Sequence, residues 1–181
     1  MFRVDAFVAD VQRCLAQPDP LAAVADVLRA VVAEPDAIQE ALRARSGAPS
    51  ALGFEVFCRS ADLTIFHATL PPGFHNPPHD HGTWAVVAVY KGTERNLFYA
   101  RAAGSIVEQR RIEAAAPEVV IMPPGVIHAI ANPLPTPSHA IHVYGDDHFD
   151  SSRSMWDPAT FEEQPYGMDR FIEWTRRLSR R

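Results

Sequence analysis

Between residues 54 and 145 the chain consists of short segments rich in Val, Ile, Phe, Tyr and Thr, separated by glycine and proline. Such segments form β-strands, because β-branched and aromatic side chains pack well on a pleated surface. The spacing predicts eight strands, at 54–59, 62–70, 83–91, 94–100, 105–112, 118–122, 126–132 and 138–145. Lys91-Gly92-Thr93 is typical of a hairpin turn between two of them. Regular strand spacing favours a mainly β fold, a closed sandwich or barrel.

The segments on either side of these strands have helical patterns. Apolar residues recur at helical spacing over 4–15 and again over 21–31. Asp19 as N-cap and Pro20 at the first helical position indicate where the second helix begins. A third, shorter helix is expected after Pro35.

The length of 181 residues suits one well-packed domain and is short for two. We therefore expect a single domain over 1–181. Its predicted parts are an N-terminal helical segment (1–45), a linker (46–50), a β-barrel (50–150) and a C-terminal extension (151–181) with a helix around 169–179.

Composition and charge exclude several classes of protein. The net charge of −5 gives no attraction to nucleic acid or to an anionic membrane. No apolar run has the length of a membrane span, and the N-terminus lacks the pattern of a secretory signal. Cys14 and Cys58 form no CxxC pair, so we expect free thiols in a reducing compartment. A cytoplasmic protein without nucleic-acid or membrane partners is predicted.

Three histidines form the strongest functional signal. His79 and His81 are separated by one residue, and His128 follows Gly125 in a second Gly-Pro-rich stretch. On an extended strand, alternate side chains point the same way, roughly 6 to 7 Å apart. Two such imidazoles and a third bind one ion and leave open positions for a substrate or oxygen. We therefore predict His79, His81 and His128 as metal ligands. The unpaired histidines are interpreted as surface or hydrogen-bonded residues; they are His67, His75, His139 and His148.

The two histidine-containing stretches resemble the two motifs of the cupin superfamily. The first motif is matched by Gly73, His79, His81 and Gly92, and the second by Pro123, Gly125, His128 and Asn132. The resemblance implies a double-stranded β-helix, the cupin jelly-roll barrel. Ala85 or Val86 occupies the place of the glutamate of the first motif. The implied ligand set is therefore three histidines without a carboxylate.

Cupins with three histidines and no glutamate include the thiol dioxygenases, namely cysteine dioxygenase and 3-mercaptopropionate dioxygenase. The segment from Pro78 to Trp84 is similar to the bacterial members of that family. Ala140-Ile-His142-Val-Tyr144 resembles their Ser-x-His-x-Tyr strand. The resemblance implies that His142 and Tyr144 are catalytic residues beside the metal. Because Ala140 replaces the serine, Ser138 or a water molecule is a candidate for orienting His142.

Phe57-Cys-Arg59 resembles the Tyr-x-Arg at which cysteine dioxygenases hold the substrate carboxylate. Arg59 is therefore the implied substrate-binding residue, with an ion pair to a surface acid as the equal alternative. The resemblance implies a non-haem Fe(II) dioxygenase that uses O₂ to oxidise a small thiol carboxylate to its sulfinate.

Several alternatives stay open from the sequence. Zinc, nickel and manganese are alternative metals, because imidazole ligands suit many divalent ions. A three-histidine oxygenase acting on a diketone or enolate is a second function, and a cupin that binds a metal or small ligand without turnover is a third. Exposed strand edges are compatible with a homodimer.

Overall fold

The computed structural model describes residues 1–45 and 53–180. The helices are α1 (Val4–Cys14), α2 (Pro20–Val32), α3 (Pro35–Arg43) and α4 (Met168–Leu178). The strands are β1 (Phe54–Arg59), β2 (Thr64–Leu70), β3 (Ala85–Lys91), β4 (Thr93–Ala102), β5 (Ser105–Ala115), β6 (Glu118–Met122), β7 (Ile127–Ala131), β8 (Ser138–Tyr144), β9 (Ser154–Trp156) and β10 (Glu163–Pro165). The predicted linker at 46–50 lies outside the described residues.

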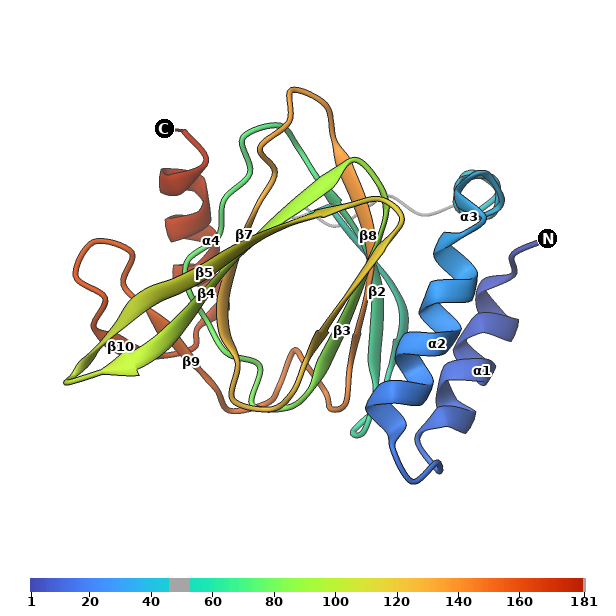
Figure 1. Cartoon of the computed structure of the whole chain (residues 1–181), viewed down its shortest axis with the longest axis horizontal. Coiled ribbons are helices and arrows are strands. Elements are labelled where there is room, and N and C mark those ends of the chain that lie inside the picture. The colour runs from blue at the N-terminus through green and yellow to red at the C-terminus, as the bar shows by residue number, and fades with distance from the viewer. Residues whose placement is uncertain (46–52, 181) are drawn as a thin grey trace.

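Two antiparallel sheets form the barrel (Figure 1). One sheet has the order β1-β2-β8-β3-β6 and the other has the order β5-β4-β7, while β9 and β10 pair with each other. Several strands that follow one another in the chain thus lie in different sheets, as in a jelly roll. The expected mainly β jelly-roll barrel, with helices at its N-terminal and C-terminal ends, is confirmed.

The turn at Gly92 does not make the predicted hairpin. β3 and β4 flank this turn, yet β3 pairs with β6 and β8, whereas β4 pairs with β5 and β7. Gly92 has a φ of 76°, and a Cβ added there would lie 3.0 Å from Ser138 Cα. Only glycine fits this corner without strain. The hairpin prediction was wrong, because a turn signal gives a change of direction and not the pairing that follows it.

The predicted start of the second helix is confirmed. Asp19 accepts a hydrogen bond from the backbone N–H of Ala22 at 3.0 Å, and Pro20 is the first helical residue. α4 agrees closely with the predicted C-terminal helix. The extension also contains β9 and β10, which the sequence pattern did not predict because each has only three residues. Among the described residues, no helix combines the length and apolar character needed to cross a bilayer.

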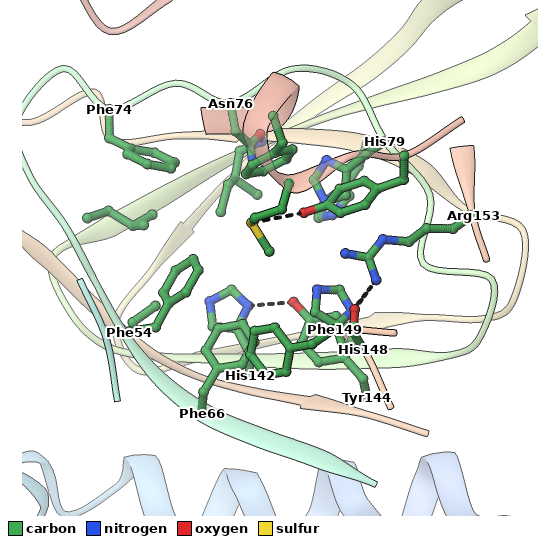
Figure 2. A pocket seen from close by; sticks show the side chains of 17 residues that line it. Phe54, Phe66, Phe74, Asn76, His79, His142, Tyr144, His148, Phe149 and Arg153 are labelled. Atoms are coloured by element: carbon green, nitrogen blue, oxygen red, sulfur yellow. Dashed lines mark hydrogen bonds between the residues drawn. The ribbon is translucent and has the colours of Figure 1, made fainter. Parts of the chain in front are cut away.

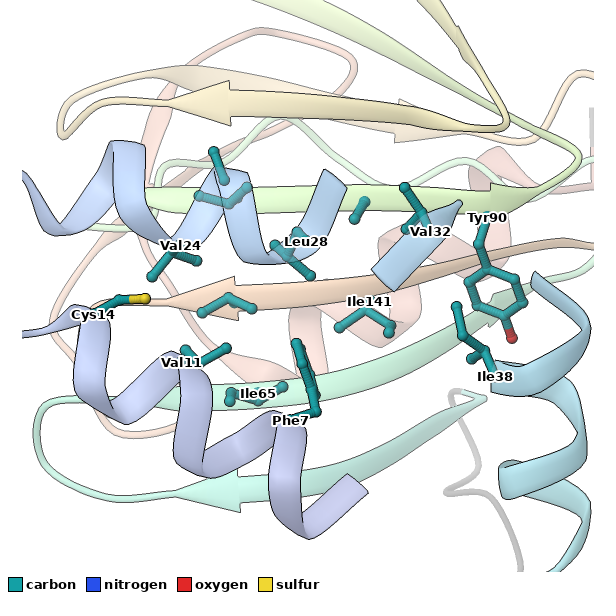
Figure 3. Close-up of a cluster of buried hydrophobic side chains, with 14 of the residues drawn as sticks. Phe7, Val11, Cys14, Val24, Leu28, Val32, Ile38, Ile65, Tyr90 and Ile141 are labelled. Carbon is teal, nitrogen blue, oxygen red and sulfur yellow. The ribbon is translucent and has the colours of Figure 1, made fainter. Parts of the chain in front are cut away.

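The N-terminal helices cover the outer face of the five-stranded sheet (Figures 1 and 3). Phe7, Val11 and Leu28 pack there against Ile65 and Ile141 in one buried cluster. Strand β3 divides this cluster from a second one inside the barrel. The side chains of β3 that face the helices are those of Val86, Ala88 and Tyr90, and those that face the barrel interior are Ala85, Val87 and Val89. This alternation places the cavity described below on the opposite side of the sheet from the helices.

Candidate metal centre and cavity

The three predicted ligands meet inside the barrel. His79 and His81 precede β3, and His128 lies in β7. The backbones of His79 and His128 exchange two hydrogen bonds of 2.8 and 2.9 Å, and this pairing brings the two segments together. One ring nitrogen from each of the three histidines lies within 4.8 Å of the others. The cluster could therefore hold a metal ion, as its spacing in the sequence predicts.

The hydrogen bonds of these rings suit metal ligation. His79 Nδ1 lies 3.0 Å from the carbonyl oxygen of Pro77, and His128 Nδ1 lies 2.9 Å from Asn96 Oδ1. In both rings Nδ1–H donates outward, so the Nε2 lone pair is free to face the cluster. Burial lowers the pKa of all three histidines, that of His79 to about 4, so the rings are neutral at physiological pH. Neutral imidazoles fit a divalent transition-metal ion.

A small apolar cavity adjoins the cluster (Figure 2). Its volume of about 40 Å³ suits a compact ligand. Its apolar walls are Phe54, Phe66, Ala68, Leu70, Phe74, Ile130, Phe149, Met168 and Phe171. Its polar lining residues bear on what the cavity can bind; they are Asn76, His79, His128, His142, Tyr144, His148, Arg153 and Tyr166.

His142 and Tyr144 both line the cavity from β8, beside the histidine cluster. His142 Nδ1 lies 3.1 Å from the Tyr144 hydroxyl, and the Tyr144 ring packs edge-on against His81 with 5.0 Å between centroids. Burial raises the pKa of Tyr144, so its phenol stays protonated. The structure brings both residues to the metal cluster, and their catalytic role stays a prediction.

A buried acid faces His142, which sequence reasoning missed. Glu94 Oε2 lies 3.6 Å from His142 Nε2, and the side chain of Glu94 is 0% exposed. Ser138, the candidate partner of His142, has a buried hydroxyl without a hydrogen-bond partner in the described chain. The available signal was the alternation of Glu94, Asn96 and Phe98 on one face of a predicted strand.

Arg59 lies away from the cavity. Its Nε donates to the two carboxylate oxygens of Asp147, at 2.8 and 3.0 Å, and half of its side-chain surface is exposed. With Asp147 it borders a shallow hollow on the outer surface. The structure therefore does not bring this predicted substrate residue to the metal cluster, and it shows the ion pair that was the alternative interpretation.

A different arginine lines the cavity. Arg153, in the C-terminal extension, is 8% exposed and stacks its guanidinium over the ring of Tyr166, 3.7 Å from the centroid. Nη1 donates to the carbonyl oxygen of His148. Nε and Nη2 are buried without a hydrogen-bond partner, and no carboxylate lies within ion-pair distance in the described chain. The charge of Arg153 acts on the carboxyl of Asp146 without forming an ion pair with it in the described chain. A buried guanidinium without an ion pair is costly, so this arrangement favours an anionic ligand.

Among the unpaired histidines, His67 and His139 are hydrogen-bonded as expected, to Tyr90 at 2.8 Å and to Thr69 at 3.2 Å. His148 is hydrogen-bonded too, with its Nδ1 3.2 Å from Arg153 Nη1, but it also lines the cavity and stacks on Tyr144 with 3.8 Å between centroids. Burial lowers the pKa of His148, which keeps this ring neutral beside Arg153. Neither His148 nor Arg153 belongs to a motif, so their place in the cavity had no local signal.

No model of a known protein family matches the chain, and no curated protein matches its sequence. Solved structures similar to it include a cupin superfamily protein from Desulfitobacterium hafniense, with 14% identity over 57% of this chain and 84% of that one, at a TM-score of 0.45. An RmlC-like cupin from Methanocaldococcus jannaschii has 17% identity over 57% of this chain and 90% of that one, also at 0.45. A single-residue variant of oxalate decarboxylase from Bacillus subtilis has 20% identity over 50% of this chain and 23% of that one, at 0.41. The function proposed below rests on the geometry of the site.

Proposed function

We propose that the chain is a non-haem iron dioxygenase that converts a small thiol carboxylate to its sulfinate. The observation that supports this most strongly is that one small cavity is lined both by the candidate metal ligands and by a buried arginine. The three-histidine cluster, which could hold a divalent ion without a carboxylate ligand, contributes His79 and His128 to the lining. The guanidinium of Arg153, which forms no ion pair with the residues that the structure describes, borders the same cavity. A ligand with two anionic ends on a short apolar stem matches both positions.

Arg153 binds the carboxylate in this proposal. Its free Nε and Nη2 are adjacent donors of one planar group, and such a pair suits two carboxylate oxygens. Tyr166 and the carbonyl of His148 hold the guanidinium in place. The bound carboxylate would leave the sulfur end of a short thiol toward His79 and His128, which line the same cavity.

A bound iron would supply a coordination position for the thiolate and the activation of dioxygen. The protein residues have other tasks. The apolar walls exclude water from the cavity. Tyr144 and His142 offer a hydroxyl and a ring nitrogen, 3.1 Å apart, where the proton lost by the thiol can be held.

The buried Arg153, which has no ion pair within the described part of the chain, favours this function over one of the alternatives that the sequence left open. A diketone or enolate substrate needs no carboxylate site, and it would not supply Arg153 with the ion pair that the described residues do not give it. A cupin that binds a ligand without turnover would also use Arg153. Only turnover separates this alternative from the enzyme.

The test is oxygen uptake by protein loaded anaerobically with Fe(II). The substrates are cysteine, 3-mercaptopropionate, cysteamine as a thiol without a carboxylate, and a β-diketone. We expect uptake with a thiol carboxylate, one sulfinate formed per O₂ consumed, and no uptake by His128→Ala. Uptake with the diketone alone would favour the second function. Stoichiometric iron binding without uptake on any substrate would favour a binding protein.

A further inference from the structure

Glu94 is the one fully buried acidic side chain among residues 1–45 and 53–180. Its Oε1 accepts a hydrogen bond from Asn96 Nδ2 at 3.2 Å, and its Oε2 lies 3.6 Å from His142 Nε2. Neither Oε2 nor His142 Nε2 has a hydrogen-bond partner elsewhere in the described chain. The gap is slightly longer than a hydrogen bond and too short to admit water. Each atom is thus the natural partner of the other.

The direction of the hydrogen bonds around Glu94 follows from the metal cluster. His128 Nε2 faces the cluster, 3.1 Å from His81 Nε2, so the proton of the neutral His128 ring sits on Nδ1. Nδ1–H donates to Asn96 Oδ1, which turns the Asn96 amide so that Nδ2 donates to Glu94 Oε1. A metal ligand therefore fixes the orientation of Asn96, and Asn96 fixes one oxygen of Glu94.

The same reasoning extends to Tyr144. An acidic oxygen opposite His142 Nε2 favours the tautomer that carries its proton on Nε2. His142 Nδ1 is then an acceptor, and the Tyr144 hydroxyl, 3.1 Å away, donates to it. The phenolic oxygen consequently offers lone pairs, and not its proton, to a ligand in the cavity.

We propose that Glu94 is a positioning residue that fixes the Nε2–H tautomer of His142 and thereby sets the direction of the Tyr144 hydroxyl. Hydrogen bonds connect the metal ligand His128 through Asn96 to Glu94, and a 3.6 Å approach connects Glu94 to His142. Glu94 takes the orienting role for which Ala140 lacks a polar atom, and it acts from β4 and not from β8. The effect on turnover rests on the proposed function, whereas the tautomer does not.

The test is the tautomer of His142 in protein loaded with Zn(II), read from long-range ¹H–¹⁵N correlations of ¹⁵N-labelled histidine. The His142 signals are identified by their loss in His142→Asn. We expect Nε2–H in the wild type and Nδ1–H in Glu94→Gln. In that variant Asn96 holds the carbonyl of the new glutamine toward Nδ2, so the glutamine amide donates to His142 Nε2. A wild-type Nδ1–H tautomer, or an unchanged tautomer in Glu94→Gln, would overturn the proposal.

Tyr144→Phe is the matched control, because it removes only the other partner of the His142 ring. We expect this variant to keep Nε2–H, since Glu94 is still present. A change to Nδ1–H in Tyr144→Phe would show that Tyr144 and not Glu94 sets the tautomer. This result would overturn the proposal even if Glu94→Gln does not fold.

Kinetics give a separate readout. If the iron-loaded chain oxidises a thiol carboxylate, Glu94→Gln should lower kcat about 10- to 100-fold while KM and iron content are retained. An unchanged kcat would overturn the catalytic part of the proposal. If no substrate is oxidised, the proposed function fails, and the tautomer measurement still decides the role of Glu94.

Discussion

The Nε2 atoms of His81 and His128 lie 3.1 Å apart, and burial holds the pKa of both rings well below the usual range. When both rings are neutral, each turns a nitrogen lone pair toward the other, unless one ring donates a proton to the other. These facing lone pairs repel each other. A shared cation relieves this repulsion and satisfies both rings. The metal-free protein should therefore be less stable than the metal-bound one.

We expect Zn(II) or Fe(II) to raise the melting temperature and EDTA to reverse the effect. At a free metal concentration of about 100 times Kd, the free energy of unfolding should rise by about 2.7 kcal/mol. Thermal unfolding and metal analysis measure this. His128→Ala should lose the response, and His139→Ala, which removes a histidine outside the cluster, should keep it. An equal response in both variants would place the metal elsewhere.

The matched pair for substrate binding is Arg153 and Arg59. Arg153→Lys keeps the charge but loses the planar pair of donors, and we expect it to raise KM for a thiol carboxylate about 10- to 100-fold, since a hydrogen bond to a charged group contributes about 1.5–3 kcal/mol. Arg59→Lys should change KM little, because its exposed ion pair with Asp147 is worth about 0–1 kcal/mol. If steady-state kinetics show a larger rise in KM for Arg59→Lys than for Arg153→Lys, then Arg59 binds the substrate.

Acid should destabilise the fold through His67. Burial lowers the pKa of this histidine to about 4, below its usual 6.5. In the unfolded chain it takes up a proton as the pH falls below about 6.5, while in the folded protein it stays neutral down to about 4. The free energy of unfolding should therefore decrease with falling pH in this window, by at most about 1.4 kcal/mol per pH unit for this group.

Urea unfolding of metal-free protein at about pH 7 and about pH 5 measures the effect. The comparison is between the wild type and His67→Gln, because other buried histidines contribute equally to both. We expect a smaller loss of stability on acidification in His67→Gln. Equal losses would mean that His67 titrates alike in the folded and unfolded states.

The N-terminal helices should contribute to the stability of the barrel. Leu28 in α2 is fully buried against the sheet, and Leu28→Ala should lower the free energy of unfolding by about 2–5 kcal/mol. Val107→Ala, at a side chain that is 51% exposed, should lower it by less than about 0.5 kcal/mol. Chemical unfolding should show a single transition for both variants. A separate early transition in Leu28→Ala would mean that the helices unfold independently of the barrel.

The sequence predicted the elements of this fold well, because their signals are local. Asp19 and Pro20 mark a helix start by their own backbone chemistry, and alternating side chains mark a strand such as β3. The pairing of strands was not accessible in this way. Gly92 indicates a turn but does not determine which strands pair on either side of it. The connection between the two sheets was therefore predicted as a hairpin.

The residues of the candidate site also differ in whether signals in the sequence predicted them. His79, His81 and His128 were predicted because their spacing encodes their geometry, and His142 with Tyr144 because their strand resembles the Ser-x-His-x-Tyr strand of the thiol dioxygenases. Glu94 reaches His142, and Arg153 reaches the cavity, only through the arrangement of β4 and of the extension. Arg59 was chosen by resemblance, and Asp147 holds it at the surface, 88 positions away in the chain. Tertiary contacts of this kind leave no mark in the spacing of nearby residues.

The C-terminal extension supplies one wall of the cavity: Arg153, Tyr166, Met168 and Phe171 all line it, and Phe171 meets His79 edge-on with 5.4 Å between ring centroids. Translation proceeds from the N-terminus, so the ribosome makes every metal ligand before it makes this wall. In a chain synthesised only as far as β8, we expect the histidine cluster to lie open to water. We therefore expect metal to enter most easily before the residues of this wall are in place.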